Sequence, residues 1–147
     1  MTTMGDLSML DLSSTSLGIT SSLPRHLAAV EEVFNRQLLS DLPAVVDLTN
    51  HISRYRGKML RPTLTILAGL AAVNGDESAL ESALESDNLL RLAAVIEMIH
   101  MATLVHDDVL DEADERRGAR TVNRLRGNEA AVMLGDYLIS AAFHLCS

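Results

Sequence analysis

Apolar residues recur at helical spacing along most of this chain, and polar residues separate the runs. The longest run ends just before residue 107 and comprises Leu89, Leu92, Val95, Ile96, Ile99 and Leu104. Intervals of three and four residues are typical of an amphipathic helix. The strict alternation of apolar and polar residues that would indicate strands occurs nowhere in the sequence. The pattern therefore predicts an all-α protein.

The first 22 residues differ in composition from the rest of the chain. They are rich in Ser, Thr and Gly, which favours a flexible leader over residues 1–22. Pro24 suits the first turn of a helix. We therefore expect the folded domain to cover residues 23–147.

Proline and glycine separate the next two helices. One begins near Pro43 and ends before Gly57, and the next covers residues 63–73 after Pro62. An Asn-Gly pair at 74–75 would end that helix. A polar segment then leads into the long apolar run.

The charged, glycine-containing stretch 113–127 predicts a loop. Asn128 can cap a last helix, whose apolar pattern is still running at the final residue. A domain usually closes its last helix with a cap or a polar tail. We therefore expect the chain to be the front part of something larger, with a helical domain that is incomplete at its C-terminus.

Composition narrows the classes of function. Hydrophobic residues make up 48% of the 147 residues and aromatic residues only 3%, so the core must consist of aliphatic side chains, which favours helices. The net charge of −8 argues against nucleic acid as a partner and against docking on anionic membranes. Arg91, Glu97 and Asp107 interrupt the most apolar stretch, so we expect no transmembrane segment. The single cysteine, Cys146, excludes an intrachain disulfide and fits a cytoplasmic location.

Three carboxylates close the long helical pattern, in the sequence HDDVLD at 106–111. Asp107 and Asp111 lie at positions i and i+4, hence on one face of a helix, and Asp108 is rotated to the side. Like charges repel, and the C-terminal end of a helix disfavours carboxylates, so a bound cation explains the cluster economically. Oxygen ligands of this kind suit Mg²⁺. A solvated charge cluster without a ligand is the alternative.

Basic residues accompany the aspartates. Lys58 and Arg61 lie at the start of a helix, where free N–H groups and the helix dipole also favour an anion. Arg116 and Arg117 are adjacent, so their side chains point in different directions and can serve two anions, unless they pair with neighbouring carboxylates. His100 is seven residues before the first aspartate and shares its face, although a histidine on an apolar helix is more often a core residue.

Taken in order, these residues resemble the trans-type polyprenyl (isoprenyl) diphosphate synthases. The matching segments are GKMLRP at 57–62, EMIHMATLVHDDVLD at 97–111, RRG at 116–118, GN at 127–128 and GD at 135–136. The resemblance covers the chain from about residue 27 to the end. It implies an antiparallel helical bundle of the isoprenoid synthase type. It also implies a prenyltransferase of isoprenoid biosynthesis that condenses isopentenyl diphosphate with an allylic diphosphate.

The resemblance implies a role for each candidate residue. Asp107, Asp108 and Asp111 would form the first aspartate-rich motif, whose catalytic carboxylates bind Mg²⁺ that bridges to the allylic diphosphate. Arg116 would help to hold that diphosphate. Four residues would hold isopentenyl diphosphate, namely Lys58, Arg61, His100 and Arg117.

The resemblance also bears on the length of the product. Ala102, Thr103 and Ile99 would line the pocket for the growing chain below the first aspartate. Shorter-product members of the family usually place a bulky aromatic side chain at one of these positions. Its absence here implies a product of geranylgeranyl length or longer.

The chain departs from the family in one major respect, because the second aspartate-rich motif is missing after Asp136. We therefore expect a partial or truncated chain that is inactive alone and that, in complete form, is a homodimer or a heteromer. A non-catalytic helical interaction partner, or the small subunit of a heteromeric synthase, is the alternative.

Overall fold

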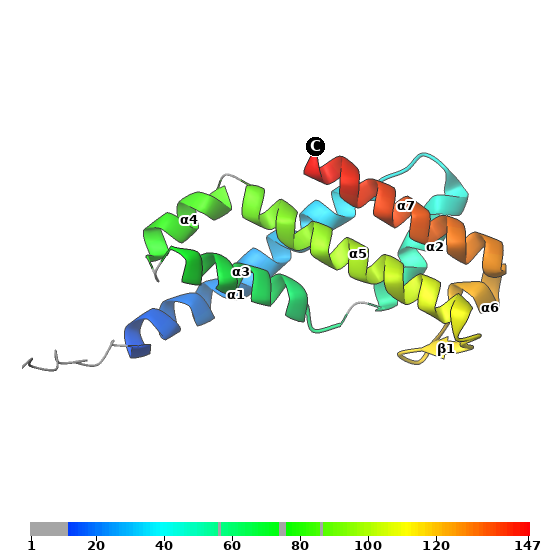
Figure 1. The fold of residues 1–147 in the computed structure, drawn as a ribbon, viewed down its shortest axis with the longest axis horizontal. Coiled ribbons are helices and arrows are strands. Elements are labelled where there is room, and N and C mark those ends of the chain that lie inside the picture. Colours follow the sequence, from blue (N-terminus) through cyan, green and yellow to red (C-terminus); the bar gives the residue numbers. More distant parts are fainter. Residues whose placement is uncertain (1–11, 56, 74–75, 86) are drawn as a thin grey trace, which may run out of the picture.

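The structure is a computed structural model, and it describes residues 12–147 except 56, 74–75 and 86. Within these ranges the chain forms a bundle of helices with one short hairpin at one end (Figure 1). The elements are α1 (Leu12–Gln37), α2 (Pro43–Ile52), a 3-10 turn η1 (Ser53–Tyr55), α3 (Leu60–Ala72), α4 (Glu77–Glu85), α5 (Asn88–Leu110), β1 (Glu115–Arg116), β2 (Ala119–Arg120), α6 (Val122–Arg126) and α7 (Asn128–Cys146). The prediction of an all-α helical fold is confirmed.

Helix α5 is the centre of the bundle. It packs most extensively on α7 and also contacts α3 and α1, so it is covered on several sides (Figure 1). Small residues make this close packing possible, since Ala93, Ala94 and Ala102 of α5 are fully buried. Met98 and Met101 fill the remaining space, as flexible side chains can do in an irregular core. The long apolar run of the sequence is thus the core helix.

The N-terminal part differs from its prediction. Helix α1 already begins at Leu12, so residues 12–22 are helical and Pro24 lies inside the helix rather than in its first turn. Residues 1–11 of the predicted leader, like the Asn-Gly pair at 74–75, lie outside the described residues. Proline removes only one backbone hydrogen bond, and a helix that is supported by packing further along can continue through it.

The predicted loop 113–127 also contains regular structure. Strands β1 and β2 pair antiparallel, with Glu115 opposite Arg120. The two turn residues between them, Arg117 and Gly118, both have positive φ angles, 52° and 76°, which is the type I′ geometry that suits a tight hairpin. Strands of two residues are too short to show alternation in a sequence, so the pattern could not reveal them.

The predicted cap of the last helix is wrong in detail. Helix α7 follows Gly127, which has a φ of 88° and occupies the cap position, and no side chain caps the helix. Asn128 is instead the first helical residue. A positive φ at this position favours glycine, which explains the Gly-Asn order.

The argument that Arg91, Glu97 and Asp107 make the apolar stretch too short for a membrane span is wrong by length and hydropathy. Helices α5 and α7 are both long and apolar enough to cross a bilayer. Core helices meet the same criterion, and half of the apolar window of α5 is buried within the structure. The position of α5 among its neighbours is sufficient to explain its composition.

Several large apolar side chains remain exposed on the bundle. Leu60 and Leu64 on α3, Leu92 and Ile99 on α5, and Met133 on α7 are among them. The exposed residues of α5 lie on the same helix face as Asp107. Positions 92, 96, 99, 103 and 107 are three or four residues apart, which is the helical repeat. An apolar column on α5 therefore leads away from the aspartates.

Candidate functional site

The three aspartates of the acidic motif do not share one environment. Asp107 and Asp111 are exposed at the C-terminal end of α5, whereas Asp108 is only 1% exposed. The backbone N–H of Asp111 donates to the carbonyl oxygen of Asp107 at 2.8 Å, so the helix holds both residues one turn apart. The outward-facing pair is thus Asp107 and Asp111.

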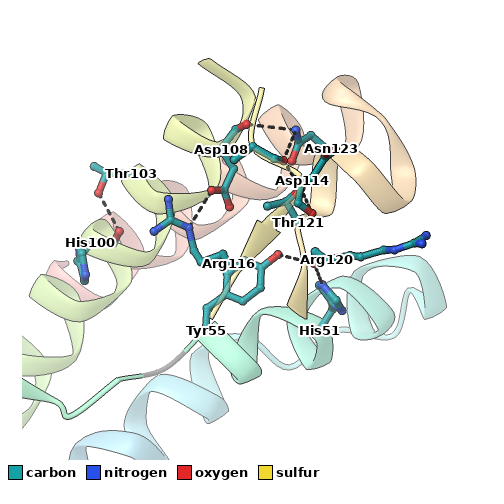
Figure 2. A network of polar contacts seen from close by, with 11 residues as sticks. His51, Tyr55, His100, Thr103, Asp108, Asp114, Arg116, Arg120, Thr121 and Asn123 are labelled. Carbon is teal, nitrogen blue, oxygen red and sulfur yellow. Dashed lines mark hydrogen bonds and ion pairs between the residues drawn. The ribbon is translucent and has the colours of Figure 1, made fainter. Parts of the chain in front are cut away.

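Asp108 points inward and pairs with Arg116 of the hairpin. Nε of Arg116 donates to Oδ1 of Asp108 at 2.8 Å (Figure 2). Burial raises the pKa of the Asp108 carboxyl, and the adjacent Arg116 guanidinium opposes that shift. Within the described residues, Oδ2 of Asp108 has no hydrogen-bond partner. The burial costs free energy that this single ion pair offsets in part.

Two further side chains, those of Asn123 and Thr121, hold the segment that follows α5 in place. Nδ2 of Asn123 donates to the carbonyl oxygen of Asp108 at 3.1 Å and to that of Ala113 at 3.3 Å (Figure 2). The hydroxyl of Thr121, which is fully buried, donates to the same carbonyl of Ala113 at 2.6 Å. Side-chain hydrogen bonds from Thr121 and Asn123 therefore hold the start of α6 against the end of α5.

A third set of bonds holds the hairpin to α2 and η1. The carbonyl oxygen of Arg120 accepts from Nε2 of His51 at 2.7 Å and from the hydroxyl of Tyr55 at 3.1 Å (Figure 2). Tyr55 is 1% exposed, and burial, aided by the negative charge of Asp108, raises its pKa to about 12. The phenol is therefore a hydrogen-bond donor at neutral pH.

Four basic residues from three parts of the chain line one small cleft with a volume of about 50 Å³. They are Lys58, Arg61, His100 and Arg117. Partial burial and then the charge of Arg61 lower the pKa of His100, so its ring is neutral at pH 7 and can donate one hydrogen bond. The structure thus brings together four residues that the sequence only suggested as a set.

Gly57 leaves room for the guanidinium of Arg117. A Cβ at position 57 would overlap the guanidinium of Arg117 where it now lies, so glycine leaves room for this close approach. The positive φ of Arg117 in the hairpin turn sends its side chain away from that of its neighbour Arg116. One arginine therefore lines the small cleft while the other pairs with Asp108.

The residues predicted to line a chain-length pocket separate in the structure. Ile99, which is 44% exposed, and Thr103 lie on the open face of α5. Ala102 is fully buried and belongs to the helical core instead. The hydroxyl of Thr103 donates to the carbonyl oxygen of His100 at 2.8 Å, so it is bound to its own helix (Figure 2).

Sequence reasoning missed several residues of this region. Tyr55, Asn123 and Gly57 position the hairpin and its arginines. Their roles depend on contacts between segments that are far apart in the sequence, which no local pattern shows. Glu97 is buried beside the basic cleft; the sequence placed it in the matching segment 97–111 but gave it no role of its own.

The donor set suits a divalent cation only in part. No group of three His, Cys, Asp or Glu side chains converges in the described part of the chain, because Asp108 is turned inward. Asp107 and Asp111 remain as two exposed carboxylates one turn apart. Mg²⁺ commonly takes one or two carboxylates together with water and substrate phosphates, so this pair fits such an ion.

Comparison with known proteins identifies the family. The model of the polyprenyl synthetase family matches residues 43–147. An all-trans-nonaprenyl-diphosphate synthase from Rhodobacter capsulatus is 39% identical over 127 residues, which cover 86% of this chain and 36% of that protein. The chain thus spans about a third of the length of the curated relatives it matches.

Solved structures agree with this assignment. The decaprenyl diphosphate synthase from Rhodobacter capsulatus has a TM-score of 0.71 and 37% identity, covering 86% of this chain and 36% of its own. The polyprenyl synthase from Caulobacter crescentus, complexed with calcium and isoprenyl diphosphate, also has a TM-score of 0.71, with 30% identity, and covers 90% of this chain and 37% of its own. With the bundle, the aspartate pair and the basic cleft in place, this chain belongs to the polyprenyl synthetase family.

Proposed function

We propose that this chain supplies the front part of the active site of a prenyltransferase that condenses isopentenyl diphosphate with an allylic diphosphate. The observation that carries the proposal is that the basic cleft is built against helix α5 at His100, and that the same helix ends in the exposed pair Asp107 and Asp111. His100 of that cleft lies close enough to Asp107 for the carboxylate charge to act on its pKa. Sites for two diphosphates thus adjoin.

The two arginines have separate tasks in this proposal. Arg117, with Lys58 and Arg61, binds the diphosphate of isopentenyl diphosphate, and neutral His100 donates a further hydrogen bond. Arg116 uses Nε for Asp108. Its other N–H groups would bind the allylic diphosphate. Asp108 is therefore a positioning residue in this scheme and not one of the metal ligands.

Asp107 and Asp111 would hold Mg²⁺ where the allylic diphosphate binds. When bound, such an ion stabilises the negative charge that develops on the leaving diphosphate. The cationic side chains around the cleft contribute to the same stabilisation, and their effect grows where water is excluded. The aspartates and the basic side chains of this chain would thus act by binding and orienting the diphosphate groups.

The apolar column on α5 is the proposed path of the growing chain. From Asp107 to Leu92 the helix extends about 22 Å at the usual rise per residue. Ile99 and Thr103 lie along it without an aromatic side chain to block it. Relatives named as nonaprenyl and decaprenyl synthases support a product longer than geranylgeranyl diphosphate.

Catalysis is proposed for a protein that also contains the other two thirds of the relatives' length, in the same polypeptide or in a partner chain. A cytoplasmic location and a dimeric or heteromeric assembly belong to the same proposal. The alternative of a non-catalytic partner is not favoured, because this chain keeps both the exposed aspartate pair and the basic cleft.

The proposal can be tested by Mg²⁺-dependent binding of geranyl diphosphate to the chain, measured by calorimetry. The variant Asp107→Asn/Asp111→Asn should lose the dependence on Mg²⁺. The control Glu112→Gln/Glu115→Gln removes the same charge from exposed neighbours and should retain it. Equal loss in both variants, or Mg²⁺-independent binding throughout, would contradict the proposed roles.

A further inference from the structure

A second basic cleft lies on the outer side of the hairpin. It has a volume of about 540 Å³ and lies between the end of α2, η1, the hairpin and α6. Its charged lining consists of Arg54, Arg117 and Arg120, with His51 beside them. Arg117 lines both this outer cleft and the small cleft that contains Lys58.

The three arginines of the outer cleft have no acidic partner among the described residues. Nearby carboxylates are already paired, since Asp47 binds Arg126 at 2.6 Å and Asp114 binds Arg124 at 3.1 Å. Glu115 faces Arg120 across the hairpin, but no ion pair joins them. Three unpaired guanidinium groups in a protein with a net charge of −8 are therefore an uncommon concentration of positive charge.

The framework of the outer cleft is held in place before any ligand binds. The hairpin turn sets the backbone position of Arg117, and Gly57 leaves room for its guanidinium. The carbonyl oxygen of Arg120 is bound by both His51 and Tyr55, which fixes the strand that carries its side chain. A fixed framework lowers the entropy that binding must overcome, so a small ligand can bind with useful affinity.

We propose that the outer cleft is a second anion site, specific for phosphate or diphosphate, which shares Arg117 with the inner cleft. Guanidinium groups bind phosphate oxygens through pairs of parallel hydrogen bonds. The cleft can hold a small oxyanion, and the negative charge of the whole chain disfavours a polymeric one such as nucleic acid. The site is inferred from the charges and the geometry, and it does not depend on the proposed catalysis.

The first test is calorimetric titration of the 147-residue chain with inorganic diphosphate at low ionic strength and without Mg²⁺. We expect Arg54→Ala/Arg120→Ala to weaken the binding about tenfold or more, which corresponds to about 1.4 kcal/mol. The matched control is Arg25→Ala/Arg36→Ala, which removes the same charge from exposed arginines that pair with glutamates on α4 and α1. Equal affinities of the two variants would overturn the proposal.

A second variant separates the two clefts. Lys58→Ala/Arg61→Ala removes the inner cleft and should leave one diphosphate site that remains sensitive to Arg54→Ala/Arg120→Ala. Loss of all binding in Lys58→Ala/Arg61→Ala would assign the ligand to the inner cleft and overturn the outer site. Titration with inorganic phosphate shows whether one phosphate group suffices. Tighter binding of an oligoglutamate peptide than of either anion would replace the proposal with a protein contact.

Discussion

The buried ion pair between Asp108 and Arg116 can be tested by the substitution Arg116→Leu. The change removes the partner of a carboxylate that is 1% exposed and leaves neither of its oxygens with a side-chain hydrogen bond. Removing one partner of a fully buried pair costs about 3–5 kcal/mol. The side chain of Arg116 is 25% exposed, so water can replace part of its effect, and we expect about 2–3 kcal/mol.

Thermal unfolding followed by circular dichroism measures this loss. For a chain of this size, 1 kcal/mol lowers the melting temperature by about 2–4 °C, so we expect a decrease of about 5–10 °C near neutral pH. Arg124→Leu is the matched control, since it removes an arginine from Asp114 at a similar distance of 3.1 Å. That pair is 62% and 75% exposed, so its loss should cost less than about 1 kcal/mol.

The pH dependence distinguishes a buried charge from lost packing. Burial already raises the pKa of Asp108, and loss of the arginine that opposes this shift raises it further. A carboxyl whose pKa is raised in the folded state favours folding at low pH, and this contribution is lost as the pH rises through that pKa. The deficit of Arg116→Leu should therefore shrink as the pH falls from neutrality. Equal deficits in Arg116→Leu and Arg124→Leu, or a deficit that grows on acidification, would refute the reasoning.

Three further predictions concern α5 and its neighbours. A Cβ on Gly135 would overlap the ring of His106, so in Gly135→Ala this ring must move and lose its hydrogen bond to the carbonyl oxygen of Val132. We expect a loss of about 1 kcal/mol in denaturant unfolding, and a smaller loss when Gly135→Ala is made in the His106→Ala background. Equal losses in the two backgrounds would contradict the contact. Thr103→Phe lies on the open face and should keep the fold while shortening the product of the complete enzyme, whereas buried Ala102→Phe should destabilise the chain. Similar melting temperatures for these two variants would oppose that placement. Burial lowers the pKa of His100, so the folded state favours the neutral ring, and the stability that the neutral ring contributes should be lost as the pH falls below about 6.5. NMR titration of the ring should give an apparent pKa below that value. A higher value would contradict the burial.

Periodicity made the helical framework predictable. The run before Asp107 predicted the core helix, and α5 extends over it as Asn88–Leu110. The same period could not show which side of α5 is covered, because apolar residues occur around most of the helix. Ala102 and Thr103 are adjacent and were assigned to one pocket, yet one is buried and the other exposed. The packing of the neighbouring helices on α5 distinguishes them.

The candidate site was predictable as a set of residue types but not as a geometry. Spacing correctly placed Asp107 and Asp111 on one face. It could not show that Asp108 is buried, because that depends on Arg116 returning through a hairpin that the sequence did not reveal. Lys58 and Arg117 line one cleft, and this too depends on contacts between segments that are far apart in the sequence.

The hydrogen bond from Tyr55 to the hairpin has a practical consequence for spectroscopy. The chain has no tryptophan and only two tyrosines, so its intrinsic fluorescence comes from Tyr55 and Tyr137 alone. Tyr55 is buried and bound to the carbonyl oxygen of Arg120, and its ring lies edge-on to His51 with centroids 5.5 Å apart. Release of the hairpin would change the surroundings of half of the emitting groups. Tyrosine emission therefore reports on the docking of the hairpin β1–β2 without any added label.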